Sequence, residues 1–332
     1  MNSNKTVSII GTGSYVPDKV ITNHDLSKIM DTSDEWIFSR TGMKERRICS
    51  SDQATSDLAA IAAKKAIEDA SILPEEIDLI IVATLSPDMF FPSTACFVQE
   101  KIKAHNAFCY DIGAACSGFL YAMEVARAQI MSGTIKTALV IGAEKMSMFL
   151  DWKDRSTSIL FGDGAGAAIL QSNNNSKGVM PAVMYSDGSL ADLLWVPAGG
   201  SKNPISHEMI DKKEHFVKMQ GKEVFKHAVI RMSDSVLETL SINKISVEDI
   251  SCFIPHQANV RIIDSIAKRL GVEDRMFSNI EKYANTSSAA LAIAIDEASK
   301  NKVISKGDYV VLTVFGSGFT WGANVIEWDK EI

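Results

Sequence analysis

The chain has 332 residues, 46 % of them hydrophobic and 23 % charged, which is ordinary for a globular protein with a sizeable core. Acidic residues outnumber basic ones by 41 to 34, and the net charge of −7 gives no general reason to expect nucleic acid or an anionic membrane as a partner. No apolar run approaches the length of a membrane span, and the N-terminal segment MNSNKTVSIIGTG lacks the basic and apolar regions of a signal peptide.

The cysteine content predicts a reducing compartment. The number of cysteines is odd, and their spacing matches no zinc-binding pattern. The five are Cys49, Cys96, Cys109, Cys116 and Cys252. We therefore expect reduced thiols, a cytoplasmic location and no bound metal.

The first half of the chain alternates short apolar segments, typical of buried strands, with segments of helical periodicity. Thr55 or Ser56 is expected to cap a helix that runs to about Ala70. A further helix is expected to start after Pro92. The glycine-rich turn in FGDGAGAAIL, 161–170, predicts close backbone packing before another strand, in preference to phosphate binding. The other expected strands are Val7–Ile10, Asp78–Thr84, Phe108–Ile112 and Thr137–Gly142.

The second half of the chain repeats the first. Asp78–Thr84 matches Asp249–Pro255, and Thr137–Gly142 matches Asp308–Thr313, each at an offset of 171 positions. One offset shared by several elements predicts a duplicated α/β unit.

The linker-like stretch NNNSK, 173–177, separates the two predicted halves, 1–172 and 178–332. A pseudo-twofold pair of this kind would bring the ends of equivalent elements together at its centre. Loops of the second half should therefore lie near their counterparts in the first.

Cys116 stands where the strand Phe108–Ile112 turns through small residues into a helix that we expect to end at Gly133. A thiol at a helix N-terminus faces unpaired N–H groups and the positive end of the helix dipole, both of which favour the thiolate. The small neighbours leave room for a second group to approach the sulfur, as in other strand–turn–helix elbows. A lone cysteine at a crowded turn is more often a structural residue, so the nucleophile hypothesis depends on partners.

Two loops of the second half supply such partners. His256 follows a predicted strand in IPHQAN, and Asn285, in YANTSSAA, occupies the position equivalent to Ala114. The histidine can accept or donate a proton, and both side chains can donate hydrogen bonds to a developing oxyanion. Each residue alone would indicate only a capping position or a helix start. Together with Cys116 they predict a catalytic set, and the backbone N–H groups of Cys116 and Gly318 are candidates for an oxyanion hole.

Four motifs in order, DIGAACSGF, IPHQAN, YANTSSAA and GSGFTWGA, resemble those of the β-ketoacyl-acyl-carrier-protein synthase III family. The resemblance covers essentially the whole chain and implies a thiolase fold, with duplicated α/β halves in a layered α-β-α-β-α architecture. It implies that Cys116 takes an acyl group from acyl-CoA. His256 and Asn285 would then stabilise the enolate formed when malonyl-acyl-carrier protein loses carbon dioxide. The product would be a 3-oxoacyl-acyl-carrier protein at the start of fatty-acid synthesis, made without metal, flavin or nicotinamide.

The resemblance also implies binding residues outside the catalytic set. Phe91 would cross the interface of a homodimer and shape the partner's acyl pocket. Lys222 stands where the family commonly has Asn, and the bulky segment Met89–Phe91 leaves the primer length open. The expected CoA-binding residues are Trp36, Arg40, Arg155, Phe225 and Asn259, and those expected to dock the acidic carrier protein are Arg261, Lys268 and Arg269.

Two alternative functions stay open on the sequence alone, and a third is disfavoured. The same fold and residues serve acyl transfer or condensation in secondary metabolism, as in quinolone- and polyketide-forming relatives. The Cys–His pair could instead hydrolyse thioesters. A non-catalytic module that binds carrier proteins is disfavoured because Cys116, His256 and Asn285 are all present.

Overall fold

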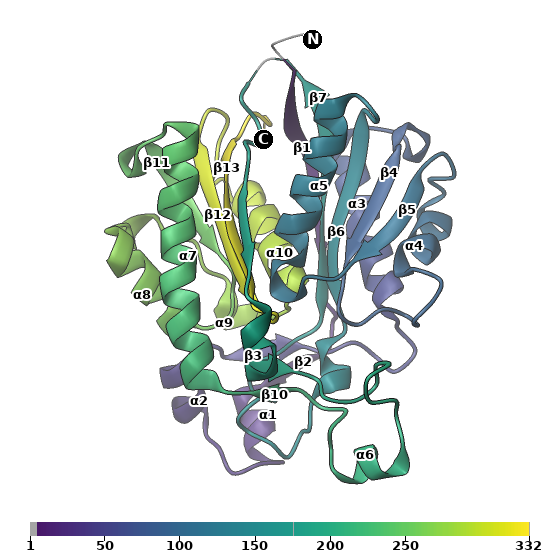
Figure 1. Cartoon of the computed structure of the whole chain (residues 1–332), viewed down its shortest axis with the longest axis vertical. Coiled ribbons are helices and arrows are strands. Elements are labelled where there is room, and N and C mark those ends of the chain that lie inside the picture. The colour runs from purple at the N-terminus through teal and green to yellow at the C-terminus, as the bar shows by residue number, and fades with distance from the viewer. Residues whose placement is uncertain (1–4, 175, 332) are drawn as a thin grey trace.

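Two β-sheets alternate with layers of helices in the computed structural model, which describes residues 5–174 and 176–331 (Figure 1). The first sheet has the strand order β1 (Thr6–Tyr15), β7 (Gly164–Asn173), β6 (Thr137–Glu144), β4 (Leu79–Ala83) and β5 (Phe108–Ile112). The second has the order β8 (Val183–Ser186), β13 (Thr320–Glu327), β12 (Tyr309–Gly316) and β11 (Ile250–Pro255).

Helices fill the space between the sheets and cover their outer faces. Between the sheets lie α5 (Gly118–Ser132) and α10 (Ser288–Lys300). The outer face of the first sheet carries α3 (Thr55–Ala70) and α4 (Thr94–Ile102), and that of the second carries α7 (Gly221–Asn243) and α8 (Val260–Leu270). The layers therefore follow the predicted α-β-α-β-α order, and the predicted fold class is confirmed.

The alternation of side chains along the central strands explains this layering. In β4, Leu79, Ile81 and Ala83 pack into the cluster around α5 and α10. Ile80 and Val82 point the other way, into the cluster around α3 and α4. A parallel strand buried on both faces must be apolar at every position, and that is the composition from which the strand was predicted.

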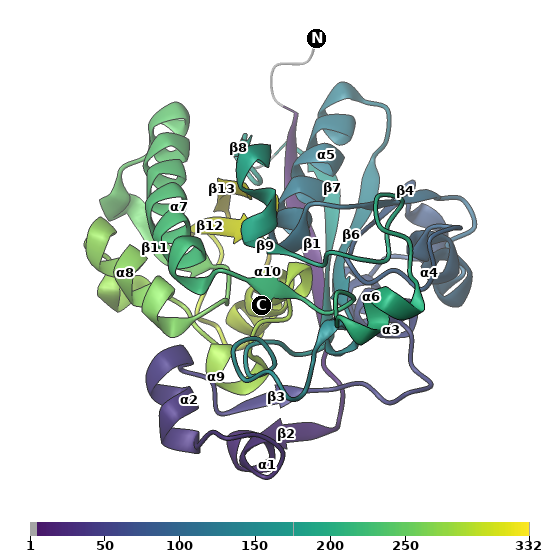
Figure 2. The same ribbon diagram turned by 60° about the horizontal axis from the view of Figure 1, so that its bottom comes forward.

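Short elements gather at one end of the two sheets (Figure 2). The strands β2 and β3 form a small ribbon, and β9 pairs with β10. These elements are β2 (Val20–Thr22), α1 (Asn23–Ser27), α2 (Asp34–Thr41), β3 (Glu45–Arg47), β9 (Leu194–Trp195), α6 (His207–Asp211), β10 (Lys218–Met219) and α9 (Ile280–Tyr283).

The two sheets share one strand order, as a duplication requires. The counterpart of the edge strand β5 is reduced in the second sheet to a single bridge between Phe253 and Met276. A cluster of buried side chains that runs through α5 and α10 joins the two sheets into one core. The division into halves at 1–172 and 178–332 stays a prediction.

The structure corrects the predicted cap of α3 and agrees with the predicted packing of the glycine turn. Ala54, and neither Thr55 nor Ser56, is the N-cap of α3, and its N–H donates to the Asp57 carboxylate at 2.8 Å. The Thr55 and Ser56 hydroxyls instead donate to Ser86 O and Asp88, which hold the loop after β4. The expected close packing at the glycine turn is present, because a side chain at Gly166 would lie 2.6 Å from Ala292 of α10.

None of the helices within residues 5–174 and 176–331 is both long and apolar enough to cross a lipid bilayer.

Candidate active site

Cys116 lies in a strained elbow between β5 and α5. Ala115 adopts a left-handed conformation with φ 49°, a region that non-glycine residues seldom occupy. A single 3-10 turn, Ala115–Ser117, then leads into α5, which ends at Gly133 as the sequence predicts. Cys116 is 7 % exposed and lines both of the cavities described below.

The end of β12 packs directly on the backbone of this elbow. A Cβ atom at Gly316 would lie 2.8 Å from the N atom of Cys116, so only glycine fits there. The next residue, Ser317, lines the larger cavity together with Cys116. Gly318 lines neither of the two cavities described below, and its role in an oxyanion hole stays a prediction.

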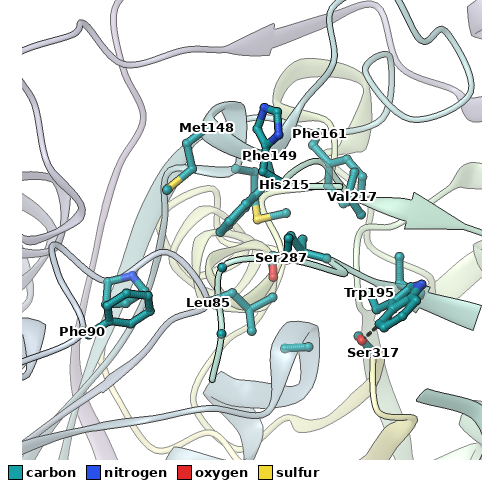
Figure 3. A pocket seen from close by; sticks show the side chains of 18 of the residues that line it. Leu85, Phe90, Met148, Phe149, Phe161, Trp195, His215, Val217, Ser287 and Ser317 are labelled. Carbon is teal, nitrogen blue, oxygen red and sulfur yellow. Dashed lines mark hydrogen bonds between the residues drawn. The ribbon is translucent and has the colours of Figure 1, made fainter. Parts of the chain in front are cut away.

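Two cavities meet at Cys116. The larger, of about 710 Å³, is mainly apolar and is drawn in Figure 3, where Ser287 lies in the middle of the lining side chains. Apart from residues 115, 116, 287 and 317, its lining comes from three segments, 85–90, 146–161 and 194–217, among them Leu85, Phe90, Met148, Phe149, Trp195 and Val217. The smaller, of about 250 Å³, leads away past α2, α7 and α8. A thioester could therefore reach the sulfur with its two arms in different cavities.

His256 follows β11 and lines the smaller cavity together with Cys116. Its backbone N–H donates to Thr313 O at 2.8 Å, which ties the residue to β12. Burial lowers the pKa of the imidazole to about 4, so the ring is neutral at neutral pH. Its Nδ1 is buried and has no hydrogen-bond partner in the described part of the chain. A neutral imidazole can donate a hydrogen bond to a substrate or accept one from it.

Asn285 also lines the smaller cavity with Cys116 and His256. Its backbone is held on both sides, because its N–H donates to Leu160 O at 2.9 Å and its carbonyl accepts from the Gly162 N–H at 3.1 Å. Its side-chain oxygen accepts from the Ser287 N–H at 2.8 Å. That bond leaves the amide NH₂ group as the donor toward Cys116. Burial raises the pKa of the thiol, and the hydrogen bond with the Asn285 side chain opposes that rise. The structure thus brings the three predicted residues together.

Ser287 and Glu144 belong to the same site, and sequence reasoning missed both. The Cys116 thiol lies 3.5 Å from Ser287 Oγ, and Ser287 Oγ donates to Glu144 at 3.1 Å. A signal for Ser287 was available, because it stands 171 positions after Cys116 and is its counterpart in the repeat. Glu144 gave a weaker signal, as a charged residue at the end of the apolar strand β6.

The predicted CoA-binding residues surround the smaller cavity. Trp36, Arg40, Arg155, Phe225 and Asn259 all line it. The Arg40 and Arg155 guanidinium carbons lie 4.4 Å and 4.9 Å from the centre of the Trp36 ring. This combination of an aromatic ring with two cations suits a planar base that carries phosphates.

The residues predicted to meet protein partners are exposed. Arg261, Lys268 and Arg269 lie on the solvent side of α8, and Arg269 also pairs with Asp234 of α7 at 2.8 Å. Phe91 is 83 % exposed beside the mouth of the larger cavity, which its neighbour Phe90 lines. Lys222, at the start of α7, is exposed as well.

Within residues 5–174 and 176–331, no group of three or more His, Cys, Asp or Glu side chains is arranged to hold a metal ion.

Comparisons with known proteins agree with this site. Family models described as 3-oxoacyl-[acyl-carrier-protein (ACP)] synthase III and its C-terminal part match residues 110–188 and 240–328. A β-ketoacyl-[acyl-carrier-protein] synthase III of Clostridium acetobutylicum is 52 % identical over 99 % of this chain and 100 % of its own. One from Caldanaerobacter subterraneus is 50 % identical over 97 % and 98 %.

Solved structures give the same result. The crystal structure of a 3-oxoacyl-[acyl-carrier-protein] synthase III from Aquifex aeolicus has a TM-score of 0.89 and 46 % identity, over 97 % of this chain and 100 % of its own. The priming β-ketosynthase of the R1128 polyketide pathway has a TM-score of 0.93 and 31 % identity, over 100 % and 99 %. The chain therefore belongs to the β-ketoacyl-[acyl-carrier-protein] synthase III family and is a condensing enzyme of the acyltransferase class.

Proposed function

We propose that the protein condenses an acyl-CoA primer with malonyl-acyl-carrier protein and releases 3-oxoacyl-acyl-carrier protein and carbon dioxide, at the start of fatty-acid synthesis. The observation that carries the proposal is the meeting of two cavities at one buried thiol, with His256 and Asn285 beside it. In this reading the smaller cavity holds the pantetheine arm and CoA, and the larger holds the acyl group. Cys116 keeps the acyl group between the two half-reactions.

Mass spectrometry of the intact protein tests this function against its alternatives. Incubation with acyl-CoAs from acetyl to medium-chain and branched should add one acyl mass at Cys116. Addition of malonyl-carrier protein should discharge it and form the 3-oxoacyl product. Discharge by water alone would indicate a thioesterase, and discharge only by another extender would indicate a secondary-metabolism role such as that named for the R1128 ketosynthase.

We propose that α8 docks the acidic carrier protein. Arg261 and Lys268 are exposed on it, and its N-terminal residue Val260 follows Asn259, which lines the smaller cavity. A carrier protein bound there could pass its pantetheine arm directly toward His256. The proposal needs this local patch because the chain as a whole carries a charge of −7.

Reversing two charges on α8 should therefore weaken the binding of malonyl-carrier protein but not that of acyl-CoA. We expect Arg261→Glu with Arg269→Glu to raise the KM for malonyl-carrier protein about tenfold and to flatten its salt dependence, because steering by exposed charges is screened within roughly 10 Å at 0.1 M salt. Acylation of Cys116 by a small acyl-CoA should change little. A matched control is Lys244→Glu with Lys302→Glu, which makes the same charge change at exposed sites. Equal damage to both half-reactions would indicate a structural role for α8.

We propose that the enzyme is a homodimer. Among the residues that the structure describes, the edge strand β5 has a neighbouring strand on one side only, and Phe108 and Tyr110 on it stack with ring centres 6.5 Å apart. Phe90 and Phe91 are 86 % and 83 % exposed. Burial of such aromatic surface stabilises a protein interface, and pairing of the edge strand satisfies its free backbone groups.

Sedimentation of the purified protein should give the mass of two chains. If Phe91 shapes the partner's acyl pocket, Phe91→Ala should extend the accepted primers by several carbons without dissociating the dimer. Leu73→Ala, which removes another exposed apolar side chain, serves as control. A monomer in sedimentation, or an unchanged primer range, would refute the respective part of the proposal.

We also propose a cytoplasmic location. All five cysteines are free thiols, which agrees with a reducing compartment. Fractionation of cells with an antibody against the protein tests the location.

A further inference from the structure

The Cys116 thiol donates to the hydroxyl oxygen of Ser287, which stands at the equivalent position of the second half. The two residues are 171 positions apart, and Sγ lies 3.5 Å from Oγ. Each stands just before a central helix, Cys116 before α5 and Ser287 before α10. Both are buried, at 7 % and 0 % exposure, so water does not readily replace this contact.

Glu144 lies behind Ser287 and is fully buried at the end of β6. One of its carboxylate oxygens accepts from Ser287 Oγ at 3.1 Å and from Ser288 Oγ at 2.9 Å. The other accepts from Ser86 Oγ at 2.7 Å and from the Leu85 N–H at 3.0 Å. A buried carboxylate needs such donors, since no cation pairs with it in the described part of the chain. If Ser287 turns away, the Ser288 hydroxyl, which also lies 2.8 Å from Ala83 O, can give its one hydrogen to Glu144.

We propose that Ser287 is a positioning residue whose hydroxyl hydrogen alternates between Glu144 and the sulfur of Cys116. While Cys116 carries its proton or an acyl group, the Ser287 hydroxyl donates to Glu144. When the sulfur loses its proton, the hydroxyl rotates and donates to the thiolate, and Ser288 alone serves that oxygen of Glu144. The role rests on the proposed function of Cys116. In acylation the Sγ–C bond forms, the bond from carbon to the CoA sulfur breaks, and that sulfur takes up the proton.

Ser287 and Glu144 act on the sulfur with opposite signs. Burial raises the pKa of the Cys116 thiol to about 12. The hydrogen bond with Ser287 opposes this and lowers the pKa, whereas a negative charge on Glu144 raises it further. Burial also raises the pKa of Glu144 itself, and the hydrogen bonds that its carboxyl group accepts oppose that rise. The other titratable side chains that line the two cavities are Asp88 and His215 in the larger, and Arg40, Arg155 and His256 in the smaller.

Alkylation of Cys116 by iodoacetamide, followed by peptide mass spectrometry between pH 7 and 9, separates these effects on the full-length protein. Only the thiolate reacts, so the rate at fixed pH reports its population. We expect Ser287→Ala to slow alkylation about tenfold, the effect of losing a hydrogen bond to a charged group. We expect Glu144→Gln to accelerate it several-fold. Thr286→Val is the matched control, because it removes a neighbouring buried hydroxyl that has no hydrogen-bond partner in the described part of the chain.

Opposite shifts in the two variants, with Thr286→Val close to wild type, would establish the role. Shifts of the same sign, or no shift in Ser287→Ala, would overturn it and leave Ser287 as a packing residue. If Ser287→Ala fails to fold, Ser287→Gly also removes the hydroxyl and suits the left-handed backbone at φ 52°. The assay uses no acyl-CoA, so its outcome is independent of whether the protein condenses acyl groups.

Discussion

Replacement of Cys116 by alanine is expected to abolish acyl-enzyme formation and to lower condensation by on the order of 10⁴-fold or more, because the covalent intermediate cannot form. The substitution removes only a sulfur from a buried site, so the thermal midpoint should shift by a few degrees at most. Intact-protein mass spectrometry with an acyl-CoA measures the first effect, and product formation measures the second.

Two further measurements test whether the loss of acylation is specific to the Cys116 thiol. Cys252→Ala removes a buried thiol that lines neither cavity, and it should retain acylation. Cys116→Ala should keep part of the decarboxylation of malonyl-carrier protein, since His256 and Asn285 remain in place. Normal acyl labelling of the Cys116 variant would move the nucleophile to another of the five thiols.

His256→Ala and Asn285→Ala are expected to impair the malonyl half-reaction far more than the acylation of Cys116. Each should lose about a hundredfold to a thousandfold in malonyl decarboxylation, the usual cost of one donor to a developing oxyanion. Some acylation of Cys116 should survive in both. The physical reason is that both side chains line the smaller cavity with Cys116, where the pantetheine thioester would lie.

Release of labelled carbon dioxide from malonyl-carrier protein measures this effect directly. The buried imidazole has a pKa lowered to about 4, so it is neutral throughout the range from pH 6 to 8. Decarboxylation should therefore show no titration of His256 in that range. Wild-type turnover of the malonyl substrate in either variant would remove that residue from the mechanism.

The predictable part of the site came from position within a repeat. The strands β4 and β6 recur as β11 and β12. Both β4 and β6 are buried along their whole length, and such strands can be recognised in a sequence because they must be apolar throughout. His256 lies in the loop after β11, and Asn285 lies in the loop before α10. Once the offset of 171 was known, these residues could be placed beside Cys116 without a structure.

Other parts carried no periodic signal. The segment 194–217 lines much of the larger cavity, but it contains only the short elements β9 and α6. Its conformation depends on tertiary contacts such as the bond from the Val217 N–H to Phe149 O at 3.0 Å, which local sequence does not encode. Glu144 was missed for a related reason: its burial depends on serines brought from distant parts of the chain.

The central helix layer has a consequence for synthesis of the protein on the ribosome. Helix α10 packs on β1, β6 and β7 of the first sheet, yet it is translated more than a hundred residues after them. A nascent chain that has completed the first sheet therefore still exposes part of its inner apolar face. Such surfaces attract chaperones and favour aggregation. The reactive thiol is also enclosed late, so it gains its neighbours only when nearly the whole chain has emerged.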